Sequence, residues 1–240
     1  MATRLTGPVL VSAAEIFSSS SNQEHDLGAL AISADGRKYR YQLAGGTALV
    51  PGKLQQAPAE ITNHQDLTAT AASAIGDTTI NVTLGATEAT ANQYAGGYLM
   101  VTTTPGQGYQ YKIKSNPAAD ASAAIVITLA DPIKVALTTS SVVDLVLSPY
   151  SGTLVLPTTA SSAPTGVAVH PTVASEYGWI QTGGPACILA NNAITVGVNV
   201  SASNGVAGSV EAAVTAQAAI GYAITGIADA EYGAIYLTID

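Results

Sequence analysis

The sequence predicts an all-β fold of the β-barrel or sandwich type, built as one domain or as two small β domains, with little helix. Alternation of apolar and polar residues, the period of a half-buried strand, recurs along the chain, whereas the period of a helix is scarce. An Asp-Gly pair separates two alternating segments, and both residue types tolerate the positive φ of a hairpin turn. A chain of 240 residues can bury a core without metals or disulfides.

The first predicted element is a β-hairpin. Residues 27–33 are mostly apolar, and residues 37–43 alternate a charged or amide side chain with Tyr or Leu. Asp35 and Gly36 lie between the two segments, where the hairpin needs its turn. The charged and amide side chains are then interpreted as a solvated strand face.

Further strands are predicted by alternation or, where the strand is buried, by a continuous apolar run. Residues 86–94, with Gly96 and Gly97 after them, fit either a short helix or a loop. The Ala-rich residues 210–219 also fit a helix, but Val214 and Thr215 are β-branched and favour a strand. The predicted strands span residues 78–84, 109–114, 124–129, 142–147, 177–182, 194–200, 209–217 and 233–239.

Three regions are predicted along the chain. Residues 1–60 form an N-terminal arm and the hairpin region, residues 61–150 a middle β region, and residues 151–240 a C-terminal β region. The middle region is open to two interpretations, a separate domain or an insertion into one barrel. The Pro-, Ser- and Thr-rich residues 157–164 are the best candidate for a linker or long loop.

Charge is low and unevenly distributed. Charged residues make up 10% of the chain, against about 25% in a typical soluble domain. All eight basic residues lie between Arg4 and Lys134, and the net charge is −8. Nucleic-acid binding requires cations opposite phosphates, so no nucleic-acid partner is expected. The basic residues Arg37, Lys38 and Arg40, with Lys53, form either a docking patch or part of a solvated surface.

No catalytic or cofactor site is predicted. The chain has three His residues and lacks the Gly-x-Ser-x-Gly and Gly-Lys-Ser/Thr signatures of serine hydrolases and phosphate loops. The single Cys187 excludes an internal disulfide and lies in an apolar run, so it is interpreted as a core residue. No apolar stretch reaches the roughly 18 residues that span a membrane. We therefore expect neither an enzyme, a cofactor, a metal nor a membrane partner.

The densest motif surrounds the only tryptophan of the chain. Tyr177 and Trp179 lie in a Gly-flanked run at residues 176–186. Large aromatic side chains on such a strand either anchor an interface or fill the core of a β-barrel. Both interpretations remain open at the level of the sequence.

Three blocks of the sequence resemble the capsid decoration, or cement, proteins of tailed bacteriophages. They are residues 35–54, residues 92–99 with 106–113, and residues 177–186, in that order. The resemblance implies β-rich subunits, often trimeric, that lie on the outer capsid surface of the virion and bind the major capsid protein. It transfers no active-site residues.

Low charge and a mean hydropathy of +0.31 also favour self-association, for which we expect a homotrimer. Two other functional classes remain as alternatives. One is another surface assembly protein, such as a head fibre, a tail component or an S-layer-like adhesin. The other is an enzyme such as a phage-borne hydrolase.

Overall fold

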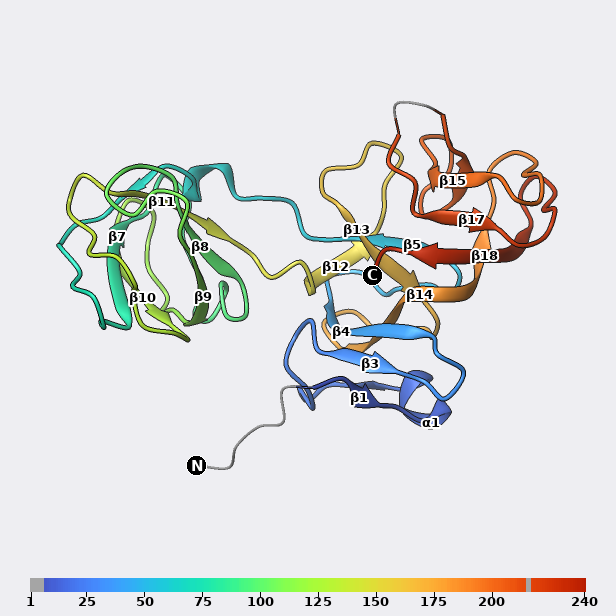
Figure 1. Ribbon diagram of the computed structural model, residues 1–240, viewed down its shortest axis with the longest axis horizontal. Helices are drawn as coiled ribbons and strands as arrows, with labels where there is room; N and C mark the ends of the chain where they lie inside the picture. The colour runs from blue at the N-terminus through green and yellow to red at the C-terminus, as the bar shows by residue number, and fades with distance from the viewer. Residues whose placement is uncertain (1–6, 215–216) are drawn as a thin grey trace. The chain divides into compact units, whose positions relative to one another are not determined.

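The computed structural model describes residues 7–214 and 217–240 (Figure 1). Strands account for 41% of the chain and helices for 3%, so the predicted all-β class is confirmed. The helical turns are α1 (Ala13–Ile16) and a 3-10 helix at Thr62–His64. The described part of the chain has no helix that could span a bilayer.

The chain folds into two compact units. The first unit joins residues up to Pro58 with Pro149–Asp240, and the second is Ala59–Ser148. We call them the split unit and the inserted unit. The first and third regions of the sequence therefore share one unit, although residues 1–6 of the N-terminal arm lie outside the described residues.

The inserted unit is a closed β-barrel. Its sheet has the order β6-β11-β8-β9-β10-β7, and a bridge between Ala69 and Val82 joins the first strand to the last. The sequence allows either a helix or a loop at residues 86–94. The structure has turns there and no helix. The strands are β6 (Leu67–Thr68), β7 (Thr79–Thr83), β8 (Tyr98–Val101), β9 (Gln110–Ser115), β10 (Ala124–Leu129) and β11 (Val142–Val146).

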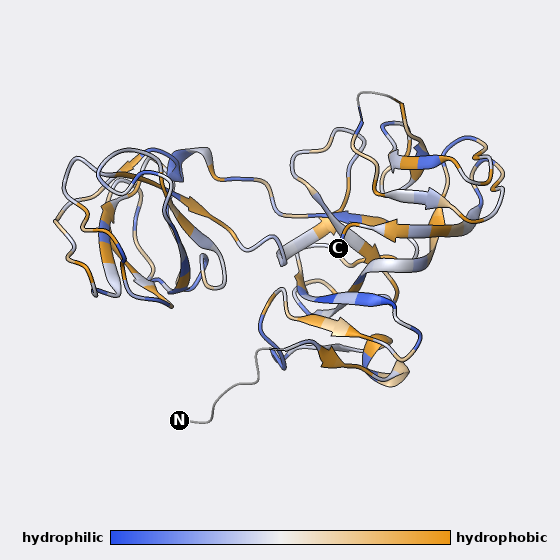
Figure 2. Ribbon diagram, viewed as in Figure 1, coloured by the Kyte–Doolittle hydropathy of each residue, from blue (hydrophilic) through white to orange (hydrophobic). Residues whose placement is uncertain are grey.

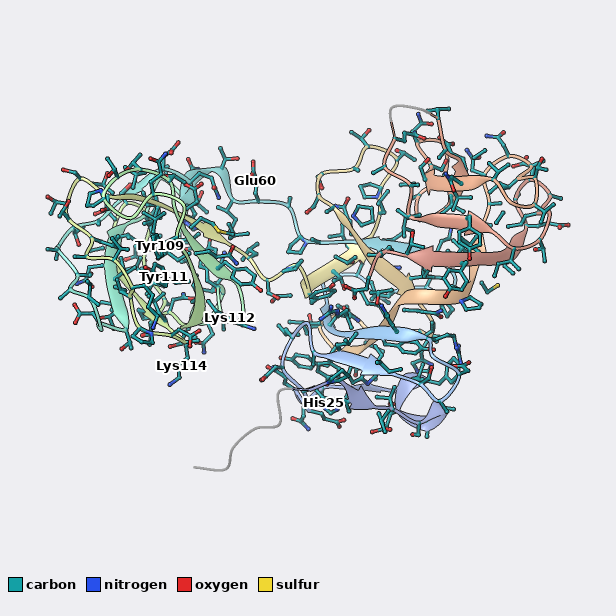
Figure 3. The ribbon with its side chains drawn as sticks, in the orientation of Figure 1. His25, Glu60, Tyr109, Tyr111, Lys112 and Lys114 are labelled. Carbon is teal, nitrogen blue, oxygen red and sulfur yellow. The ribbon has the colours of Figure 1, made fainter. Side chains whose placement is uncertain are left out.

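Alternation of apolar and polar residues along each strand explains how the barrel forms its core. On β9, Tyr111 and Ile113 are buried, whereas Lys112 and Lys114 are exposed (Figure 3). The inward residues of all six strands belong to one continuous apolar core, and Figure 2 shows hydrophobic residues along these strands. The four strands predicted for this region are therefore confirmed.

A buried polar pair lies inside the inserted unit. His64 and Tyr94 are fully buried, and the His64 Nδ1 atom is hydrogen-bonded to the Tyr94 hydroxyl. The His64 Nε2 atom lies 2.9 Å from the Thr87 carbonyl oxygen. A carbonyl only accepts, so Nε2 carries the proton and Nδ1 accepts from Tyr94. Burial raises the pKa of the Tyr94 hydroxyl, which keeps it a donor.

In its described residues, the split unit contains a sheet of twelve strands. The hairpin predicted around Asp35-Gly36 is confirmed, because β3 pairs antiparallel with β4. The strands are β1 (Val9–Leu10), β2 (Ser19–Ser20), β3 (Leu30–Ile32), β4 (Lys38–Ala44), β5 (Leu54–Gln56), β12 (Ser151–Val155), β13 (Pro164–Ala168), β14 (Tyr177–Leu189), β15 (Asn199–Ala202), β16 (Val210–Ala212), β17 (Gly221–Ala223) and β18 (Tyr232–Thr238).

Strand β14 belongs to two rings of strands. Its first half pairs with β4 and β13, which are connected through β5 and β12. Its second half pairs with β18, followed by β17, β15 and β16. A bridge between Ala190 and Val210 closes this second ring. Closed rings leave few unpaired strand edges, so the faces of the strands are the surface available for contact.

Some predicted strand limits are wrong in the split unit. Residues 194–200 contribute only a bridge at Ile194 before β15 begins at Asn199, because Gly197 has a φ of 80° and turns the chain. The strand predicted at 209–217 is limited to Val210–Ala212, and residues 215–216 lie outside the described part of the chain. β14 runs seven residues beyond the predicted 177–182, to Leu189.

Candidate interaction surface

Strand β18 separates an inner from an outer face of the split unit. Ile235 and Leu237 are buried in the core of the second ring. Tyr232, Ala234 and Tyr236 alternate with them and point to the opposite, solvent side. Tyr232 is 50% exposed and Tyr236 is 38% exposed. Exposed aromatic side chains that lie next to each other on one strand face mark this outer face as a candidate contact surface.

The strand register extends this face across three strands. Tyr222 of β17 lies opposite Tyr236, and their rings stack with centroids 5.2 Å apart. Cys187 of β14 lies opposite Ala234. We call the surface the tyrosine face, and it consists of Pro185, Cys187, Leu189, Tyr222, Ile224, Tyr232, Ala234 and Tyr236.

The composition of the tyrosine face is that of an interface centre. It carries no charged residue, and interface centres are enriched in aromatic side chains and depleted in charge. Tyr222 and Tyr236 present large, rigid surfaces that lose little side-chain entropy on contact. The face is therefore inexpensive to desolvate and suited to binding another protein surface.

A groove of about 310 Å³ borders the tyrosine face. Tyr232 forms part of its wall and lies so close to Gly52 that a Cβ atom there would be 2.5 Å from the ring. Phe17, 50% exposed, adds a further aromatic ring. The groove is lined by Phe17, Arg37, Pro51, Gly52, Ala168, Val169, Gln181, Pro185, Ala186, Cys187 and Tyr232.

The prediction that Cys187 is a core residue is wrong. Its neighbours Ala186 and Ile188 are buried, whereas Cys187 is exposed. The run is apolar on both sides because the inner side fills the core and the outer side forms the tyrosine face. Apolar composition alone does not tell these two sides apart.

Of the aromatic residues singled out in the sequence, Trp179 lies in the core. It is 4% exposed and packs in one cluster with Ile16, Tyr39 and Tyr41. Tyr177 is half-buried at the edge of that cluster, with its ring centroid 6.0 Å from that of Tyr41. Trp179 therefore does not present its indole as an exposed anchor.

The four basic residues singled out in the sequence each have a partner inside the split unit. The Arg37 Nε atom donates to Asp35 at 2.7 Å, and Arg40 donates to both carboxylate oxygens of Asp240, at 2.6 and 2.9 Å. Lys38 donates to the Asp240 carbonyl at 3.3 Å. Lys53 donates to the Ala207 carbonyl at 3.0 Å. The carboxylates of Asp35 and Asp240 offset the charges of Arg37 and Arg40, whereas the two lysines bond to neutral carbonyls and keep their charge.

The strand face that carries Lys38, Arg40 and Gln42 is not solvated as predicted. Lys38 and Arg40 are half-buried, and Gln42 is fully buried. The Thr153 hydroxyl donates to the Gln42 side-chain carbonyl, since β12 lies beside β4 in the first ring. Ring closure thus covers a polar face that would be exposed in an isolated hairpin.

The ion pair between Arg40 and Asp240 gives a pH-dependent prediction. Hydrogen bonds from Arg40 lower the pKa of Asp240 below its usual 3.8. The ion pair therefore contributes fully to the free energy of unfolding above about pH 4. This contribution is lost as the pH falls through the lowered pKa of Asp240 in the folded state. We expect Asp240→Asn to lower the free energy of unfolding by about 1 kcal/mol at pH 7, and by less at about pH 3.

Denaturant unfolding followed by the fluorescence of Trp179 measures this effect, since the only tryptophan lies in the split unit. Glu231→Gln removes an exposed carboxylate of the same unit and is the matched control. A loss of stability that is equal at both pH values would contradict the assignment.

Among residues 7–214 and 217–240, no three His, Cys, Asp or Glu side chains are grouped so that they could hold a metal ion.

Comparison of the chain with protein-family models, with curated proteins and with solved structures found no match.

Proposed function

We propose that this protein is a structural virion protein that decorates and stabilises the outer surface of a tailed-phage capsid by binding the major capsid protein. The observation that carries the proposal is the tyrosine face, an uncharged aromatic surface on a rigid sheet. The resemblance of three sequence blocks to decoration proteins supplies the identity of the partner. Neither a cofactor nor a reaction is part of this function.

Physical considerations support a stabilising role. A subunit that binds only the assembled shell lowers the free energy of that shell through linkage. Many copies on a closed lattice give high avidity even when each contact is modest. The closed rings of the split unit and the barrel of the inserted unit limit edge-to-edge aggregation of the free protein.

Electron microscopy of native particles tests the proposal directly. We expect density for this chain on the outside of the shell, at positions related by capsid symmetry. Density on the tail, on a fibre or on a bacterial surface layer would assign the protein to another surface assembly instead. Particles stripped of the protein should also break at a lower temperature than intact particles.

Attachment should survive high salt. Burial of the tyrosine face contributes about 25 cal/mol per Å² of apolar surface and is not screened by ions, whereas exposed ion pairs contribute about 0–1 kcal/mol each. A wash in roughly 1 M NaCl, where the Debye length is about 3 Å, should leave most copies bound. Gel analysis of washed particles measures this, and wholesale release would indicate that ion pairs dominate the contact.

Self-association is expected to give a homotrimer, which sedimentation at micromolar concentration measures. Decoration proteins of this kind gain avidity when three copies bind together. A stable monomer in solution would contradict the expected trimer and leave the capsid contact to be tested on particles.

A further inference from the structure

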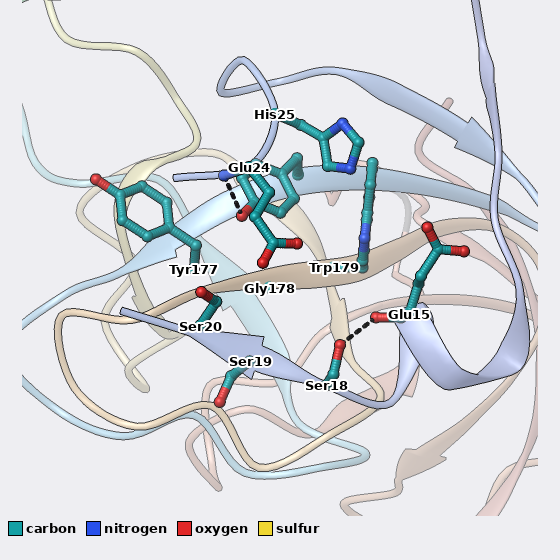
Figure 4. A pocket seen from close by; sticks show the side chains of 10 residues that line it. Glu15, Ser18, Ser19, Ser20, Glu24, His25, Tyr177, Gly178 and Trp179 are labelled. Carbon is teal, nitrogen blue, oxygen red and sulfur yellow. Dashed lines mark hydrogen bonds between the residues drawn. The ribbon is translucent and has the colours of Figure 1, made fainter. Parts of the chain in front are cut away.

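A second, smaller pocket lies on the split unit at the start of β14 (Figure 4). β2 pairs with β14 at this point, with Ser20 opposite Tyr177 and Ser19 opposite Gly178. It is separate from the tyrosine face, since it shares no lining residue with that face. We call it the aromatic pocket, and it is lined by Glu15, Ser18, Ser19, Ser20, Glu24, His25, Tyr41, Tyr177, Gly178 and Trp179.

Three packed aromatic side chains are among the residues that line the aromatic pocket. The Tyr41 and Trp179 rings meet edge to face with centroids 5.0 Å apart, and the Tyr177 ring is stacked parallel to that of Tyr41. The backbone N–H of Glu24 donates to the Tyr41 hydroxyl at 3.1 Å, which fixes the loop above the rings. Ring faces carry partial negative charge and attract cations.

Carboxylates also line the aromatic pocket (Figure 4). They are those of Glu15 and Glu24. The lining contains no Lys or Arg and one His, His25, whose ring centroid lies 5.1 Å from that of Tyr41 and 5.2 Å from that of Trp179. Glu15 is held by the Ser12 backbone N–H at 2.7 Å and hydroxyl at 2.8 Å, and these bonds lower the pKa of its carboxyl. Glu176 lies next to the pocket, where it accepts from the Ser19 hydroxyl at 2.6 Å. Rings and carboxylates together select a cation.

The size of the aromatic pocket restricts which cation fits. Its volume of about 20 Å³ is enough for one group the size of a water molecule. A primary ammonium is of that size, whereas the planar guanidinium of arginine is larger. The carboxylates are also not grouped for metal coordination in the described residues. The chemistry therefore points to an organic ammonium rather than to a metal ion.

We propose that the aromatic pocket receives the ε-ammonium of a lysine side chain from the capsid protein. This source rests on the proposed function, whereas the ligand class rests on the pocket alone. The lysine contacts the half-buried ring of Tyr177 and is neutralised by the exposed Glu24. The aromatic pocket then adds a specific contact to the broad apolar contact of the tyrosine face.

Trp179 reports binding directly, because it is the only tryptophan and lines the aromatic pocket. Titration of the full chain with n-butylammonium should give a saturable change in Trp179 fluorescence. Its neutral analogue 1-butanol, and the larger methylguanidinium and tetramethylammonium ions, should give weaker responses without saturation. Equal responses to n-butylammonium and 1-butanol would overturn the ligand class and would leave the decoration function, which electron microscopy tests, unaffected.

Variants locate the binding. Glu24→Gln and Tyr177→Leu should each weaken n-butylammonium binding by about two- to fivefold, while Glu231→Gln, an exposed site away from the aromatic pocket, should not. Circular dichroism checks that each variant is folded. On particles, Glu24→Gln should reduce occupancy while self-association in solution stays unchanged. Unchanged n-butylammonium binding in both variants would overturn the pocket, and unchanged particle occupancy would overturn the capsid lysine as its source.

Discussion

Ala234→Glu should weaken attachment to the shell by about a hundredfold or more while the free protein stays folded. Ala234 lies at the centre of the tyrosine face, opposite Cys187 and between Tyr232 and Tyr236 on the same strand face. A carboxylate placed there points to solvent in the free chain. In the complex it is buried without a partner, which costs about 3–5 kcal/mol.

The number of copies per particle, measured by gel densitometry after mixing variants with stripped shells, tests this effect. Val173→Glu is the control, since Val173 is 57% exposed in the split unit and lies outside the tyrosine face. Circular dichroism shows whether both variants fold. Normal occupancy with Ala234→Glu would mean that another surface contacts the shell.

His64→Leu should destabilise the inserted unit by about 2–4 kcal/mol. The leucine leaves the Tyr94 hydroxyl and the Thr87 carbonyl without their hydrogen-bond partner. The Tyr94 hydroxyl is then buried and unpaired, and it carries the cost of its lost hydration. Because Trp179 lies in the split unit, thermal unfolding has to be followed by circular dichroism or by hydrogen exchange of the inserted unit.

Two Tyr→Phe variants of the same barrel separate the hydrogen bond from the ring. Tyr94→Phe removes the donor to His64 and should cost about 1–3 kcal/mol. Tyr109→Phe changes a tyrosine that is 43% exposed (Figure 3) and should lie within about 0.5 kcal/mol of the wild type. Equal stability of these two variants would contradict the buried pair.

Elements whose signals are local could be predicted from the sequence. The hairpin around Asp35-Gly36 and the β10 strand at Ala124–Leu129 have the predicted position. In each case, the turn residues or the apolar run lie within a few positions of one another. Strand limits that depend on distant partners, such as the end of β14 at Leu189, carry no such local signal.

The tyrosine face and the buried amides could not be predicted, because alternation shows two faces without showing which one is covered. Gln42 and Gln55 are fully buried inside the first ring, although amides usually mark a solvated face. Tyr232 and Tyr236 alternate with Ile235 and Leu237 in the sequence. This alternation indicates that the tyrosines lie on one face of the strand and the aliphatic residues on the other. Only the pairing of β18 with β14 and β17 shows that the tyrosines point outward.

The place where the inserted unit is connected to the split unit determines how easily another domain could replace it. β5 ends shortly before Pro58, and β12 begins shortly after Pro149, yet these two strands are antiparallel neighbours with Gln56 opposite Leu154. Their ends are therefore close together, as in a hairpin that a few residues could join. The whole barrel occupies the position of a turn, so evolution or protein engineering can exchange it for another module without interrupting the strand pairing of its host.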